Sequence, residues 1–415
     1  MDERTLPRFA GPEAAARLFV QMAGEGGASD VAVVRNPSYV SQPFDLYCLA
    51  PRLTHVDEVD AVVCDMDGTL TTTEALCLHS LEYMVRRITG RPDPAVWPGL
   101  DRERDYPHII GNSTTRHVEY LVETYREAIQ PDAFEEAFRS AVEWTLREGR
   151  DALRRTEVAA NARALDDGAR LRDADPADLV RAAVDVYYAR YHQILGGIAD
   201  GAGARLAADL LGGEARLIEP MPGVGPFVAV VKGWLGTEAG RLAGSVIGAA
   251  ADGETLAELG ARFADRPARL AVVTSSIRYE AEIVLGEVLR VLREEVAAWP
   301  VSEACRSAML DHLADLDGVF DAFISASDSS EIRLKPHRDL YSLALHRLGV
   351  PKDRYGCVVG FEDSESGTIA IRAAGVGCCC ALPFADTAGH DLSAAAYVAR
   401  GGLPEVILGK RCFLR

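Results

Sequence analysis

Short runs of apolar residues, rich in valine and other β-branched side chains, recur near both ends of the chain. They occupy residues 59–64, 270–273, 357–361 and 376–382, and a weaker run covers 320–324. Helical patterns separate them, as at residues 338–348, where apolar positions share one helix face and Gly349 is suited to end the helix. This alternation predicts βαβ units and a parallel sheet that is buried on both faces.

The middle of the chain has a different pattern, with almost no strand signal. Candidate helix starts are Asn112–Ser113, Pro131 and Asp175–Pro176, because Asn, Ser and Asp cap helices and Pro favours the first turn. The last of these helices is expected to stop near Gly196–Gly197. The middle is therefore predicted to be a helical insertion in an α/β domain.

These patterns divide the chain into three units. The predicted units are an N-terminal extension at 1–58, an α/β core at 59–73 and 220–415, and a helical cap at 74–219. The extension contains one possible helix, at 13–22, and one possible strand, at 31–34, but nothing in its sequence indicates a role.

Composition and charge narrow the class of protein. The chain has 415 residues, of which 48% are hydrophobic and 26% charged, as in ordinary globular proteins. The net charge of −18 argues against nucleic acid or an anionic membrane surface as a partner, because phosphate groups require a basic footprint. No segment approaches the roughly 18 apolar residues that a membrane span needs, and the first residues lack the apolar core of a secretory signal.

The nine cysteines include no CxxC pair, and three of them are consecutive, at Cys378–Cys380. Neither a disulfide framework nor a zinc site fits this spacing. We therefore expect free thiols in a reducing compartment, which favours a cytoplasmic protein.

The first strong strand ends in the acidic segment Asp65-Met66-Asp67-Gly68. Taken alone, this segment could be a simple acidic turn. An EF-hand calcium loop does not fit, because its sixth position would be Leu70 instead of Gly and its twelfth Leu76 instead of Glu.

Three further polar segments follow strands or open helices. They are Thr274-Ser275-Ser276, Lys335-Pro336 and Glu362-Asp363. Each has a structural explanation of its own, as a helix cap, a solvated lysine or an acidic loop. Because functional groups in α/β proteins gather at the carboxyl edge of the sheet, their joint occurrence in this order favours one shared site.

In this order the four segments resemble the motifs of the haloacid dehalogenase (HAD) superfamily of phosphohydrolases. The flanks at 335–341 and 360–367 are similar to the subgroup that includes phosphoglycolate phosphatase and β-phosphoglucomutase. The resemblance implies a Rossmann-like α/β core with a parallel sheet and an enlarged helical cap inserted after the first motif. It covers the core well, is weak over the cap and is absent over the extension.

The resemblance also implies a mechanism. Asp65 would be the nucleophile that forms an aspartyl phosphate, and Asp67 would act as general acid and then general base. Thr274 would donate a hydrogen bond to the transferring phosphoryl group, and Lys335 would neutralise its charge. Since dehalogenase members lack the second aspartate, Asp67 favours phosphate chemistry over carbon–halogen cleavage.

Mg²⁺ is the implied cofactor. The implied metal site consists of Asp65, Asp67 through its main-chain carbonyl, Asp363 and, orienting a metal-bound water, Glu362. A rough charge count supports a cation here, because three carboxylates face only one lysine. A structural role for Glu362 in its loop explains the residue equally well.

Candidate substrate contacts are fewer and weaker. They are Ser275 beside Thr274, and Ser113, Arg116 and His79 in the cap. Residues 111–117 open a helix whose amides could bind an anion, although ordinary helix capping explains them as well. The predicted partner is a small phosphorylated metabolite, such as a sugar phosphate or a phosphoglycolate-like ester, and the oligomeric state is not indicated.

Two alternatives to a phosphatase stay open at this point. A β-phosphoglucomutase-like phosphomutase would use the same core with basic cap residues, which cannot be aligned here. A noncatalytic binding protein on the same fold would be expected to lack the nucleophile or the lysine, and this chain has both.

Overall fold

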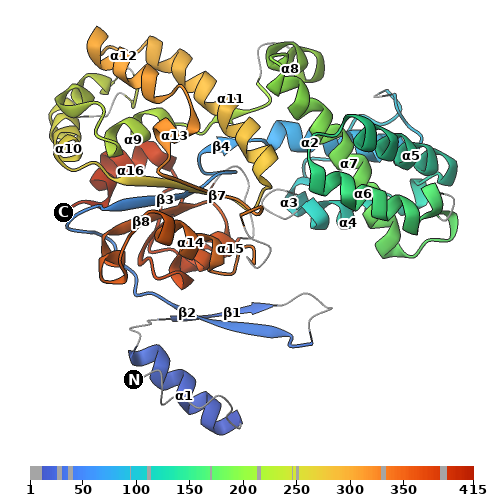
Figure 1. Ribbon diagram of the computed structural model, residues 1–415, viewed down its shortest axis with the longest axis horizontal. Helices are drawn as coiled ribbons and strands as arrows, with labels where there is room; N and C mark the ends of the chain where they lie inside the picture. The colour runs from blue at the N-terminus through green and yellow to red at the C-terminus, as the bar shows by residue number, and fades with distance from the viewer. Residues whose placement is uncertain are drawn as a thin grey trace.

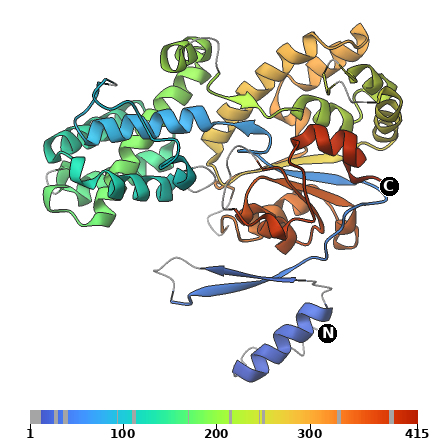
Figure 2. The same cartoon turned by 180° about the vertical axis from the view of Figure 1, so that it is seen from behind.

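The computed structural model describes most of the chain. The described residues are 12–25, 30–35, 41–93, 95–109, 114–168, 171–212, 216–244, 246–248, 252–328, 333–383 and 390–415. They form an α/β body, a helical cap beside it and a short N-terminal arm below it (Figure 1). The view from behind shows the same three parts (Figure 2).

Six strands of the body form one parallel sheet in the order β10-β9-β8-β3-β6-β7. Their bounds are β3 Ala61–Asp65, β6 Arg269–Val273, β7 Ala322–Ile324, β8 Val358–Glu362, β9 Cys378–Ala381 and β10 Tyr397–Val398. The four apolar runs predicted as strands, and the weaker fifth, are confirmed as β3, β6, β8, β9 and β7. The short strand β10 is not among the predicted strands, although it lies within the apolar segment 394–399.

Helices cover both faces of this sheet (Figure 1). They are α9 Val224–Val231, α10 Gly253–Asp265, α11 Arg278–Ala297, α12 Glu303–His312, α13 Leu316–Val319, α14 Asp339–Arg347, α15 Glu365–Ala373 and α16 Gly402–Lys410. Successive side chains of a strand point to opposite faces, so Val62 and Cys64 of β3 join the core with α9 and α16, whereas Ala61 and Val63 pack with α14 and α15. The sheet is thus buried on both sides, as predicted.

The cap consists of helices that follow the first motif in the chain. They are α2 Glu74–Ile88, α3 Tyr106–Ile109, α4 Thr114–Thr124, α5 Pro131–Glu148, α6 Ala152–Ala164, α7 Pro176–Ala199 and α8 Gly203–Leu211. The predicted starts of α5 and α7 are confirmed, and the Asp175 carboxylate caps α7 by accepting a 2.9 Å hydrogen bond from the Asp178 amide. The candidate caps Asn112 and Ser113 lie outside the described residues.

The predicted stop of the last long helix near Gly196–Gly197 is confirmed, because α7 ends at Ala199, two residues later. A Cβ on Gly197 would lie only 2.6 Å from Leu206 Cδ1 of α8. The glycine therefore also permits close packing of two helices here.

A two-stranded antiparallel ribbon marks where the chain leaves the body for the cap and returns. Its strands are β4 Thr71–Thr72 and β5 Glu219–Pro220, and the Thr71 hydroxyl donates to the Glu219 carbonyl at 2.9 Å. The sequence pattern does not predict these strands, because each is only two residues long.

A buried polar pair joins the cap to the body. His192 on α7 and Glu280 in the first turn of α11 are both buried, and their Nε2 and Oε1 atoms lie 2.7 Å apart. The Tyr279 ring lies edge-on to the His192 ring at 5.5 Å. Because these polar groups are satisfied only when α7 rests on α11, they favour the docked position of the cap.

The N-terminal arm contains α1 Pro12–Glu25 and an antiparallel ribbon of β1 Asp30–Arg35 and β2 Phe44–Leu49. The helix predicted at 13–22 and the strand predicted at 31–34 are both confirmed. Strand β2 is not predicted by the sequence pattern. Among the described residues, no helix combines the length and the hydropathy that a membrane crossing requires.

We expect His192 and Glu280 to be energetically coupled. Alanine at either position leaves the other polar group buried without its partner, which costs about 1–3 kcal/mol. The double variant should lose less than the sum of the two single losses, by about 0.5–3 kcal/mol. Urea unfolding of the wild type and the three variants measures this coupling, and strictly additive losses would show that the pair does not hold the cap.

Candidate functional site

The sheet brings the four predicted segments to one edge. Asp65 is the last residue of β3, Glu362 is the last residue of β8, and Thr274 directly follows β6. Since β8, β3 and β6 are neighbours and parallel, their carboxyl ends lie side by side. Lys335 reaches this edge from the loop that precedes α14.

The Lys335 ammonium is the centre of the site. It donates to Asp65 Oδ1, forms an ion pair with Glu362 Oε1 at 2.6 Å, and lies 3.5 Å from the Val273 carbonyl oxygen. Its side chain is 8% exposed. Burial lowers the pKa of Lys335, but the two carboxylates outweigh burial, so its pKa is raised and the ammonium stays charged.

Glu362 is fully buried, and donors surround both of its oxygens. Tyr341 donates to Oε1 at 3.0 Å, and the Ser364 hydroxyl donates to Oε2 at 2.8 Å, as do the amides of Asp363 and Ser364 at 3.1 Å. Burial raises the pKa of this carboxyl group, but the charge of Lys335 and these hydrogen bonds outweigh it and lower the pKa. Glu362 is therefore held as a carboxylate whose oxygens are already engaged.

Asp363 completes an acidic cluster with Asp65 and Glu362. One oxygen of each lies within 4.8 Å of the others. Gly68 permits this approach, because its φ is +82° and a Cβ there would lie 2.3 Å from Asp363 Oδ2. Burial, and then the charge of Glu362, raise the pKa of both Asp65 and Asp363 well above the ordinary value.

The cluster fits a hard divalent cation. Three carboxylates against one lysine leave an excess of negative charge in a buried place, and oxygen is the ligand that Mg²⁺ prefers. Asp65 and Asp363 have oxygens that are less engaged than those of Glu362, so these two side chains are the better candidates for direct ligands. The donor set therefore fits the predicted metal, while the identity of the ion stays a proposal.

The Asp67 side chain lies among hydroxyl groups. Thr73 donates to Oδ1 at 3.1 Å, Ser276 donates to Oδ2 at 3.2 Å, and the Thr274 hydroxyl lies 3.5 Å from Oδ2. Burial raises the pKa of Asp67, and the hydrogen bonds from Thr73 and Ser276 reduce that rise. The side chain is thus held in one orientation with its pKa above that of a free aspartate.

Four residues that contact the motif side chains were not predicted as site residues. They are Thr73 and Ser276 beside Asp67, and Tyr341 and Ser364 beside Glu362. Ser276 lies two positions after Thr274, and Tyr341 lies in the first turn of the helix after Lys335, so proximity to a motif was the available signal.

The predicted substrate contacts are less well supported by the geometry. Ser275 is exposed beside Thr274, and Arg116 is exposed on α4. His79 lies within the cap, 3.2 Å from Arg190 Nη2, and burial together with that cation lowers its pKa to about 4. Ser113 lies outside the described residues, and substrate roles for all four stay predictions.

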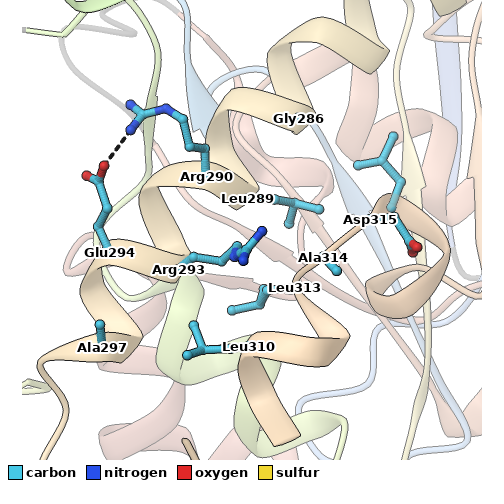
Figure 3. A pocket seen from close by; sticks show the side chains of 11 residues that line it. Gly286, Leu289, Arg290, Arg293, Glu294, Ala297, Leu310, Leu313, Ala314 and Asp315 are labelled. Carbon is cyan, nitrogen blue, oxygen red and sulfur yellow. Dashed lines mark hydrogen bonds and ion pairs between the residues drawn. The ribbon is translucent and has the colours of Figure 1, made fainter. Parts of the chain in front are cut away.

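A surface pocket elsewhere on the body contains none of the motif residues. It has a volume of about 610 Å³ and lies between α11 and the α12–α13 segment (Figure 3). Its walls combine leucines with charged side chains, among them Leu289, Arg293, Leu313 and Asp315. The chemistry described above is therefore not at this pocket.

Several solved structures are similar to this one. CbbY from Rhodobacter sphaeroides in complex with phosphate has 17% identity and a TM-score of 0.40, over 84% of this chain and 96% of that one. A HAD family hydrolase from Deinococcus radiodurans R1 with bound phosphate and sodium has 16% identity and a TM-score of 0.41, over 86% and 98%. A predicted phosphoglycolate phosphatase from Haemophilus somnus 129PT has 11% identity and a TM-score of 0.42, over 84% and 96%.

These likenesses concern the fold alone. No protein-family model matches the sequence, and no curated protein matches it. With TM-scores below 0.5, nothing about activity is drawn from the neighbours, and the chemistry rests on the side chains of this chain.

We expect Asp363→Asn to stabilise the metal-free protein. Because the pKa values of Asp65 and Asp363 are raised, the folded chain binds more protons than the unfolded chain above the ordinary carboxyl pKa of 3.8, so stability falls as the pH rises. In EDTA, the variant should therefore unfold at a higher temperature than wild type, by about 2 °C or more at pH 8. The gap should vanish near pH 4.

Added Mg²⁺ should reverse this order, since only the wild type keeps both aspartates as ligands. Thermal unfolding with and without the ion makes the comparison. Equal stabilisation of both proteins by Mg²⁺ would show that Asp363 is not a ligand.

Proposed function

We propose that this protein is a Mg²⁺-dependent phosphatase that hydrolyses a small phosphorylated metabolite through an aspartyl phosphate on Asp65. The observation that carries the proposal is the buried Lys335 ammonium shared by Asp65 and Glu362, with Asp363 and Asp67 beside them. This set combines a carboxylate nucleophile, a fixed cation and a second carboxyl group for proton transfer.

Asp65 would attack phosphorus. A carboxylate and a phosphate dianion repel each other, so the site must supply positive charge before they can approach. Lys335 provides one fixed charge, and Asp65 and Asp363 would hold the metal ion. A Mg²⁺ ion held there would supply the remaining positive charge and would polarise the phosphoryl oxygens.

Lys335 and Thr274 would bind the transferring group. The Thr274 hydroxyl accepts a 3.0 Å hydrogen bond from the Ser276 amide. Its proton, which is directed to Asp67 Oδ2 at 3.5 Å in this structure, would turn to a phosphoryl oxygen of the bound substrate. Lys335 is held in place by Glu362, so its charge needs little reorganisation when the transition state forms. Glu362 then acts as the anchor of the lysine.

Asp67 would move the proton in both halves of the reaction. In the first, an Asp65 oxygen bonds to phosphorus, the bond to the leaving alkoxide breaks, and Asp67 gives its proton to that alkoxide. In the second, Asp67 takes a proton from water as the water oxygen attacks phosphorus and the Asp65–phosphorus bond breaks. Its raised pKa suits the first role, and its hydrogen bonds fix its position.

The cap would control access to the reaction. The contact between His192 and Glu280 places α7 against α11, the helix that follows Thr274 and Ser276. A docked cap would exclude bulk water from the reacting groups and would favour a small leaving group over a polymer. A phosphorylated metabolite is therefore the proposed substrate class.

Asp65→Asn should abolish turnover. The amide cannot attack phosphorus, so Mg²⁺-dependent hydrolysis of p-nitrophenyl phosphate should fall about a thousandfold or more. Asp57→Asn, a change at an exposed aspartate on the surface, is the matched control and should keep full activity. Undiminished hydrolysis by Asp65→Asn would exclude Asp65 as the nucleophile.

Asp67→Asn should lower kcat by about 10²–10⁴-fold, because proton transfer is lost in both half-reactions. The proposed metal contact of Asp67 is its main-chain carbonyl, so Mg²⁺ affinity measured by calorimetry should stay within about threefold of wild type. Ser276→Ala, which removes only one hydrogen bond to Asp67, should have a smaller effect. A normal kcat in Asp67→Asn would contradict the proton-transfer role.

A further inference from the structure

The N-terminal ribbon of β1 and β2 has two unlike faces. Successive residues of a strand alternate between faces, and the register pairs Ala32 with Tyr47 and Asp30 with Leu49. These four residues belong to one face. The other face is apolar but open to solvent, since Val31, Val33, Phe44 and Leu46 are 44%, 63%, 48% and 53% exposed. The face that carries Asp30, Tyr47 and the buried Leu49 is the one that contacts the body.

Tyr47 makes the first contact with the body. Its hydroxyl forms a hydrogen bond with His337 Nδ1, and the two rings meet edge to face with centroids 5.4 Å apart. His337 lies two residues after Lys335, and its amide donates to the Leu334 carbonyl at 3.0 Å. This turn encloses Lys335, so a side chain that holds His337 also restrains the backbone of the lysine.

Arg372 makes the second contact, on α15. Its side chain is fully buried, and it donates to Asp30 Oδ2 at 2.8 Å and to the Ala50 and Ala394 carbonyls at 3.0 Å each. The Ala50 amide donates back to the Arg372 carbonyl at 3.0 Å. A buried guanidinium left without acceptors is strongly unfavourable, so the arm and α15 are tied together.

The two contacts are made with two segments that lie next to the Lys335–Glu362 ion pair in the chain. Helix α15 begins at Glu365, just after Glu362 and Asp363, and the turn at 334–337 carries Lys335. The ribbon therefore contacts both the turn that carries Lys335 and the helix that follows Glu362. The arm, for which the sequence indicated no role, thus packs next to the candidate site.

We propose that the β1–β2 ribbon is a brace for the catalytic lysine, and that Tyr47 is a positioning residue that acts through His337 on Lys335. The inference rests on the proposed phosphatase function for its kinetic consequence. Without the Tyr47 contact the turn at 334–337 gains freedom, and the ammonium is no longer fixed where charge develops on the phosphoryl group.

Tyr47→Phe tests the brace, because it removes the hydroxyl and keeps the ring. We expect kcat for p-nitrophenyl phosphate to fall about tenfold while KM changes less than about twofold. Phe44→Tyr, the reverse change on the exposed face of the same strand, is the matched control and should behave as wild type. Wild-type kcat in Tyr47→Phe would overturn the proposal.

A double variant separates positioning from general stability. If Tyr47 acts through His337, Tyr47→Phe should lower kcat no further in a His337→Gln background than His337→Gln does alone. If the effects of the two substitutions on kcat multiply, the contact is merely structural and the brace is overturned. The same holds if kcat falls only as far as a thermal melt shows loss of folded protein.

Hydrogen–deuterium exchange provides a readout that does not depend on activity. In Tyr47→Phe, exchange should become faster in the peptide covering 333–341 and stay unchanged in the peptide covering β6. If the wild type releases no phosphate, the proposed phosphatase function fails, and exchange alone decides the brace. Unchanged exchange at 333–341 would then overturn it.

Discussion

One buried ammonium group organises the candidate site. Lys335 is shared by Asp65 and Glu362, which come from neighbouring strands, and none of the three charges has much access to water. Transfer of such charges out of water costs several kcal/mol each, so each group depends on the other two. Asp363 adds a third carboxylate beside this single lysine, so negative charge is in excess. This excess is the physical reason for a cation at this edge of the sheet.

The arrangement around the lysine follows from the order of the parallel strands. Strands β8, β3 and β6 are neighbours, and the chain leaves the body for the cap directly after β3. The cap then meets the body again through His192 and Glu280, on the helix that follows β6. Asp65, Thr274 and the cap contact at Glu280 therefore all lie at the ends of two adjacent strands or on the helix that follows one of them.

The N-terminal arm packs against the body beside the candidate site. Its ribbon turns the face with Asp30, Tyr47 and Leu49 to the body, and it contacts the turn that carries Lys335 and helix α15. In the proposed brace, the arm would restrain Lys335 while the cap restrains the body at Glu280. The exposed apolar face of the ribbon takes no part in the contacts that form the proposed brace.

The sequence alone determined the strands and the motifs, because apolar runs and polar strand ends are local patterns: β3, β6, β8 and β9, and the residues Asp65, Asp67, Thr274, Lys335 and Glu362–Asp363, could all be recognised. It failed where the decisive partner is distant in the chain. His192 meets Glu280 across 88 positions, Arg372 meets Asp30 across 342, and Tyr47 meets His337 across 290. Only the tertiary structure decides such pairings, since they depend on which surfaces the folded chain brings together and not on the spacing of residues along it.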